Sequence, residues 1–116
     1  MIDDVEARRV LRRIRLVHTL VWALFASAIV AIPIVTALGN LRWALWLSLL
    51  EWGEVVVLFM NRMRCPLTGV AERYTADRAA NFDIYLPLWL AANNKTIFGT
   101  AFALAEVFLL VRWTTG

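Results

Sequence analysis

Long apolar runs separated by polar segments are the dominant pattern of this chain. The runs cover residues 16–38, 42–60 and 96–113, and each has about the 17–25 residues that an α-helix needs to cross the core of a bilayer. A shorter apolar stretch, 82–92, contains Asp83 and Pro87, so it is predicted to lie at the interface or to dip partly in. The pattern predicts a single all-α domain over residues 1–116, an integral membrane helical bundle with three transmembrane helices plus an interfacial or partly re-entrant helical segment.

Turn-forming residues mark the ends of the predicted helices. Pro33 is expected to kink the first helix, and Gly39 with Asn40 to end it in a tight turn, which makes the second helix antiparallel to the first. The polar segment 70–81 is expected to form a short surface helix. The run Asn93-Asn94-Lys95 is expected to cap the third span.

Composition agrees with a membrane environment. Hydrophobic residues make up 61% of the chain and charged residues 18%, whereas soluble domains have about half and a quarter. Six tryptophans in a chain of this length are typical of membrane–water interfaces, where the amphipathic ring is favoured. An ordinary soluble domain is therefore excluded.

The net charge of +3 could indicate nucleic acid binding if the basic residues shared one soluble face. They flank the apolar runs instead: five Lys and Arg residues precede the first span, one lies between the first two, five lie between the second and third, and one follows. The positive-inside rule then places the basic flank 1–15 and the loop 61–95 in the cytoplasm, with the C-terminus periplasmic or extracellular. No nucleic acid partner is predicted.

Three acids interrupt the apolar runs: Glu51, Glu54 and Glu106. An ionisable side chain in the middle of a bilayer is unfavourable by a few kcal/mol and usually faces other helices or a polar cavity. Glu51 and Glu106 fall at a similar predicted depth, where they could share a proton or accept a hydrogen bond from Ser27. Two interpretations stay open, a proton or cation site, or protonated acids that bond between helices or pair with an arginine of a neighbouring subunit.

Small residues recur at helical spacing in two of the spans. Ala23, Ser27 and Ala31 repeat every four residues in the first, and Gly99 and Ala103 share a face with Glu106 in the third. Small side chains allow two helix backbones to approach closely. Both faces are therefore predicted to make helix-packing and partner contacts.

A possible interfacial site lies near the cytoplasmic ends of the helices, and its candidate residues are His18, Cys65, Asp83, Tyr85 and Lys95. Cys65 is the only cysteine, which rules out a disulfide within the chain, and its basic neighbours Arg62 and Arg64 favour the thiolate. The alternatives are a plain interfacial cysteine or an acylated one. His18 is predicted to make at most one contact with Glu54.

Motifs for catalysis, metal binding or cofactor binding are missing from the sequence. The Glu-x-x-His pattern of metal sites in helix bundles does not occur, one histidine argues against haem held by two histidines, and neither a phosphate-binding loop nor a serine nucleophile motif is found. Neither a metal nor another cofactor is predicted, and an enzymatic activity is left open.

The run Cys65-Pro66-Leu67-Thr68, taken with His18, resembles a family of small bacterial membrane proteins known only as a domain of unknown function. The segments Asn81–Leu90 and Asn93–Gly99 are also similar to uncharacterised proteobacterial proteins of similar size. The distance from the helix acid to Cys65 is longer here than in that family, so Glu54 is not equated with its acid. The resemblance implies an architecture and a bacterial plasma (inner) membrane, and no reaction.

Together these features predict an accessory or scaffolding subunit of a larger bacterial inner-membrane complex, with the bilayer and other transmembrane subunits, or further copies of the chain, as its partners. The alternative is a small transporter or ligand-binding membrane protein that uses Glu51, Glu54 and Glu106 as a proton or cation site. A third hypothesis is an enzyme that acts at the interface through Cys65 and His18.

Overall fold

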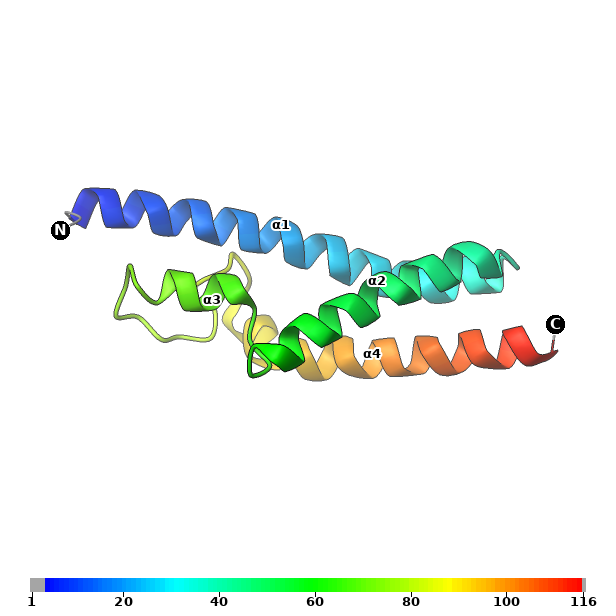
Figure 1. Cartoon of the computed structure of the whole chain (residues 1–116). Helices are drawn as coiled ribbons and strands as arrows, with labels where there is room; N and C mark the ends of the chain where they lie inside the picture. The colour runs from blue at the N-terminus through cyan, green and yellow to red at the C-terminus, as the bar shows by residue number, and fades with distance from the viewer. Residues whose placement is uncertain (1–3, 116) are drawn as a thin grey trace. The chain divides into compact units, whose positions relative to one another are not determined.

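A computed structural model describes residues 4–115, and within that range it contains helices and no strands (Figure 1). The helices are α1 (Asp4–Ala37), α2 (Leu41–Met60), α3 (Pro66–Ala71) and α4 (Leu88–Thr115). Helices α1, α2 and α4 are long and apolar enough to cross a membrane. The predicted all-α class is confirmed, and the three predicted spans correspond to three helices of sufficient length and apolarity.

Helix boundaries differ from the predictions in three places. The flank before residue 16 belongs to the same helix as the first span, since α1 begins at Asp4. The surface helix expected at 70–81 is wrong, because the short helix is α3 and residues 72–87 form turns and irregular backbone. Helix α4 begins directly after Pro87, whose carbonyl accepts the Ala91 N–H at 2.9 Å.

Asn93, Asn94 and Lys95 do not cap a helix, because they lie inside α4. Leu90, Ala91 and Ala92 directly before them are good helix formers, and no glycine or proline between Leu88 and Ile97 interrupts the helix. The predicted segment 82–92 is therefore two structures, an irregular stretch up to Pro87 and the first turns of α4. Pro33 lies inside α1, which continues to Ala37.

The chain divides into two compact units. Unit 1 consists of Met1–Trp22 and Val57–Asn93, and unit 2 of Ala23–Val56 and Asn94–Gly116. Unit 1 therefore holds the first part of α1, α3 and the irregular segment 72–87. Unit 2 holds the second part of α1 and most of α2 and α4.

Unit 2 has an apolar core. Its buried members are Ile29, Ile32, Phe102 and Ala105, and partly buried apolar residues of α2 and α4 pack against them. Trp52 meets Phe102 edge to face, with ring centroids 5.3 Å apart. The turn between α1 and α2 passes through Gly39 at φ +84°, a left-handed conformation that glycine adopts without steric strain. This confirms the predicted turn.

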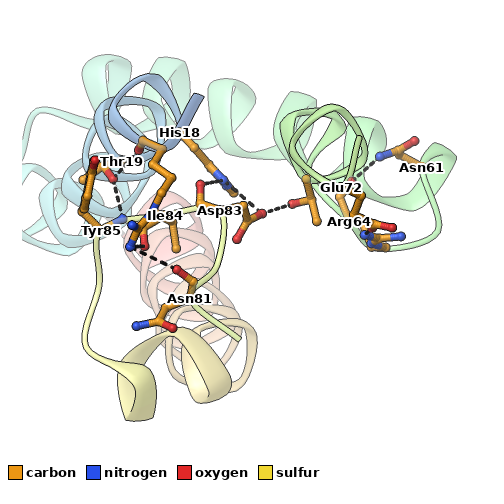
Figure 2. Close-up of polar contacts among 11 residues, drawn as sticks. His18, Thr19, Asn61, Arg64, Glu72, Asn81, Asp83, Ile84 and Tyr85 are labelled. Carbon is orange, nitrogen blue, oxygen red and sulfur yellow. Dashed lines mark hydrogen bonds and ion pairs between the residues drawn. The ribbon is translucent and has the colours of Figure 1, made fainter. Parts of the chain in front are cut away.

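Unit 1 is held together by hydrogen bonds between residues far apart in sequence (Figure 2). The Thr19 hydroxyl accepts the Tyr85 N–H at 2.9 Å. The Arg15 guanidinium donates to the backbone oxygens of Asn81 and Ile84 at 3.5 and 3.4 Å, and it lies 4.2 Å from the centre of the Tyr85 ring. These contacts fix the irregular segment against the first part of α1.

After α2 the chain reverses through two residues with positive φ, Arg62 at 58° and Met63 at 61°. Neither is a glycine, and each such conformation is unfavourable by about 1 kcal/mol or more. The Asn61 side-chain amide donates to the Arg64 carbonyl at 2.6 Å, and Arg64 forms an ion pair with Glu72. The reversal is thus held on both sides, and it delivers Cys65 to the start of α3.

Candidate functional site

The imidazole of His18 is the centre of a polar cluster in unit 1. Its Nδ1 lies 3.1 Å from the backbone oxygen of Asp83 and 3.4 Å from the Oδ2 of the same residue. A carbonyl oxygen and a carboxylate oxygen can only accept, so Nδ1 must carry the proton. In its neutral form the ring presents a lone pair at Nε2, which is the arrangement that a general base requires.

Asp83 is nearly buried, with 4% of its surface exposed. The Thr68 hydroxyl donates to Oδ2 of Asp83, the oxygen that also faces His18 (Figure 2). Burial alone would raise the pKa of this carboxyl, but the hydrogen bonds from His18 and Thr68 stabilise the charged form more, so the pKa is lowered. Asp83 is thus held as a carboxylate beside the imidazole.

Cys65 is the residue directly before α3, in an extended conformation with Pro66 at the first helical position. Its carbonyl accepts the Thr68 N–H at 2.9 Å, so the residue with the thiol and the residue that holds Asp83 share one turn. The thiol is free and partly exposed.

Opposing effects act on the pKa of Cys65. Burial raises the pKa of the thiol. It is lowered by a hydrogen bond with His18, by a hydrogen bond with the Leu67 backbone and by the charge of His18. The charge of Asp83 raises it. The net effect is a lowered pKa. The sequence predicted a favoured thiolate because of Arg62 and Arg64, but the group that acts on the thiol is His18.

Of the five predicted interfacial residues, the structure brings His18, Cys65 and Asp83 together. Tyr85 lies in the same segment as Asp83 and is held by Thr19 and Arg15. Lys95 is an exposed residue of unit 2. Sequence reasoning missed Thr68 as a member of the cluster, although its position three residues after Cys65, inside the quoted motif, was a usable signal.

Glu51, Glu54 and Glu106, the acids predicted to lie within the membrane, belong to unit 2. Glu106 accepts a hydrogen bond from the Ser48 hydroxyl at 2.5 Å, whereas Ser27, the expected donor, is exposed. Only 1% of Glu51 is exposed, and its Oε1 has no hydrogen-bond partner among the described residues. Glu54 is half-buried.

The small residues predicted to pack against helices lie mostly outside the core of unit 2. Ala23 and Ala31 are half-buried, and Ser27, Gly99 and Ala103 are exposed. A methyl group added at Gly99 would meet nothing within 4 Å. The core is built by other faces of the same helices, with Ile29 and Phe102 among its members.

Between residues 4 and 115, no group of three or more His, Cys, Asp or Glu side chains is arranged to hold a metal ion. Comparison with known proteins finds no matching family model, no similar curated protein and no similar solved structure.

Proposed function

We propose that this chain is an accessory or scaffolding subunit that docks through its transmembrane helices onto other subunits of a bacterial inner-membrane complex. The observation that carries the proposal is the position of the small residues of unit 2. Ser27, Gly99 and Ala103 are exposed, while larger side chains of the same helices form the core. Because lipid gives no hydrophobic drive for helices to associate, close backbone approach at small residues is the main source of helix docking.

The chain's own packing also supports a partner. In the most apolar stretches of α2 and α4, only 17% of the residues are buried within the chain. Val107, an exposed apolar residue of α4, follows Ala103 by one helical turn and lies beside the small-residue face. A helix that approaches over Gly99 and Ala103 would pack against this larger side chain.

Bulky substitutions on the small-residue face test the proposal. Gly99→Leu and Ala103→Leu should detach the chain from its complex and leave its own helix content unchanged, because the added atoms meet open space at Gly99. Gly53→Leu is the matched control, since Gly53 is also an exposed helical glycine with nothing within 4 Å. The readout is the size of the tagged full chain and the identity of co-purifying chains after extraction in a mild detergent.

Loss of the complex in the two α4 variants but not in Gly53→Leu is the expected result. Recovery of the wild-type chain as a lone monomer would overturn the proposal. If all three variants are recovered in the complex equally, the contact lies elsewhere and the proposal loses its main support.

A second candidate function, a small transporter or ligand-binding protein with a proton site, is favoured by one observation. Glu51 is fully buried within unit 2, with one carboxyl oxygen unpartnered among the described residues, as expected of a group that binds and releases a proton. Glu51→Gln should then abolish proton flux in vesicles containing a pH-sensitive dye while the assembly stays intact. If neither the wild type nor Glu51→Gln gives a proton flux above that of empty liposomes, the transporter hypothesis is wrong.

A further inference from the structure

The only thiol and the only imidazole of the chain lie together in unit 1, next to a buried carboxylate. We propose that Cys65 is a nucleophile that transfers its proton to His18, with Asp83 and Thr68 as positioning residues, and that it accepts an acyl group from an acyl thioester. This site belongs to unit 1, whereas the residues proposed for helix docking belong to unit 2, and the inference does not depend on that function.

The contacts of Nδ1 decide the tautomer of His18. Both groups that face Nδ1 are oxygens of Asp83, at 3.1 and 3.4 Å, and both can only accept, so this nitrogen keeps its proton in every state of the ring. The nitrogen left to take a proton from Cys65 is Nε2. A nucleophile, a base and a carboxyl group that orients the base form the constellation by which thiol and hydroxyl nucleophiles are activated.

Hydrogen bonds hold the site rigid. The carboxylate is held from two sides, by His18 and by the Thr68 hydroxyl. Thr68 in turn donates its N–H to the Cys65 carbonyl, so the thiol and the support of the carboxylate move as one turn. A nucleophile and a base that are fixed in this way need little reorganisation before reaction.

Cys65 is partly accessible to solvent, as a nucleophile must be. The side chains of His18 and Asp83 are 14% and 6% exposed, whereas Cys65 is partly exposed and carries no disulfide. Burial of the base and its carboxylate protects their contact from water. The sulfur can still be reached, and partly exposed thiols beside cationic groups are the reactive ones.

The location of Cys65 favours an acyl donor. It follows the end of α2, a candidate membrane span, by only a few residues, so the thiol would lie at the membrane–water interface once α2 spans the bilayer. Exposed apolar side chains, Phe59, Met60 and Met63, precede it, and they offer a surface for an acyl chain. A second cysteine that could resolve a disulfide is missing from the chain, so acyl transfer fits this site better than thiol–disulfide exchange does.

The step is balanced without an oxidant or reductant. The Cys65 thiol gives its proton to Nε2 of His18, and the thiolate attacks the carbonyl carbon of the acyl thioester. A new carbon–sulfur bond forms to Cys65 while the bond to the carrier sulfur breaks, and the carrier leaves as a thiol after it takes the proton back from His18. The products are acyl-Cys65 and the free carrier thiol.

The first experiment treats the full-length protein in lipid nanodiscs with palmitoyl-coenzyme A at pH 7 and follows its intact mass. An acyl adduct that hydroxylamine removes is expected on the wild type, and none on Cys65→Ser. His18→Gln should slow the reaction by about 100-fold or more, the usual contribution of a general base. The rate of this variant should recover as the pH approaches the ordinary range of a thiol, about 8.5, which a loss of structure would not produce.

Each remaining outcome decides the proposal. If no adduct forms although iodoacetamide modifies Cys65, acyl transfer is wrong, and equal rates in wild type and His18→Gln at every pH would exclude a role for His18. If His18→Gln does not fold, the iodoacetamide pH profile of the wild type decides, since a midpoint near the ordinary thiol value contradicts an activated Cys65. Thr68→Val should slow acylation by about fivefold, the effect of one lost hydrogen bond, and Thr100→Val, an exposed threonine of α4, should not.

Discussion

The two units of the chain are stabilised by different interactions. Unit 2 has an apolar core around Ile32 and Phe102, and a hydrogen bond from Ser48 to Glu106 joins side chains of different helices there. In unit 1 the irregular segment is attached to α1 by polar contacts, which His18 makes with Asp83 and Thr19 with Tyr85. Packing faces therefore define unit 2, whereas individual donors and acceptors define unit 1.

The largest effect is expected for Asp83→Ala in unit 1. Removing the carboxylate leaves both His18 and Thr68 without their partner in a nearly buried place, and breaking a buried pair lowers stability by about 3 to 5 kcal/mol. The free energy of unfolding in detergent, followed by circular dichroism, measures this. Asp77→Ala is the control, because Asp77 is exposed. Equal losses in both variants would mean that the cluster does not stabilise unit 1.

A smaller loss is expected for Ile32→Ala in unit 2. Ile32 is fully buried, and truncation leaves a cavity, which lowers stability by about 2 to 3 kcal/mol. Ile34→Ala, on the exposed side of the same helix, should change the free energy of unfolding by less than about 0.5 kcal/mol. The same unfolding measurement applies. If the two isoleucines respond alike, unit 2 is not organised around this core.

Acid should weaken unit 1 more than unit 2. Because the pKa of Asp83 is lowered by folding, the carboxylate stabilises the fold fully above the ordinary aspartate pKa of about 3.9, and this stability is lost as the pH falls through the lower value of the folded state. One such group changes the free energy of unfolding by at most about 1.4 kcal/mol per pH unit. Asp83→Asn should flatten the pH dependence of unfolding. A slope that persists in this variant would assign it to other acids.

The smallest effect is expected for Gly99→Ala, and it is a gain. Gly99 lies inside α4 with open space around its missing side chain, and alanine in a helix interior is more favourable than glycine by about 0.5 to 1 kcal/mol. The isolated chain should therefore unfold at a slightly higher denaturant concentration. A loss of stability would show that this face packs against the rest of unit 2.

Sequence patterns predicted unit 2 better than unit 1, for physical reasons. The length of the apolar runs and the Gly39 turn reflect local rules, and the structure has both. The contact between His18 and Asp83 joins residues 65 positions apart. It depends on a chain reversal at Arg62 and Met63, whose positive φ values the sequence does not indicate because neither residue is a glycine. Likewise, the choice of Ser48 rather than Ser27 as the donor to Glu106 depends on which faces of the helices meet.

The length of α1 has a consequence for where this protein can function. Its 34 residues rise about 51 Å, whereas a bilayer core is about 30 Å thick, and the charged residues of α1 are confined to its first half, with no basic residue in the last turn. In a bilayer, such a helix would be anchored at its charged end and would adjust to hydrophobic mismatch at the other. Membranes of different thickness would therefore set how deeply His18 is immersed, and with it the polarity around the imidazole.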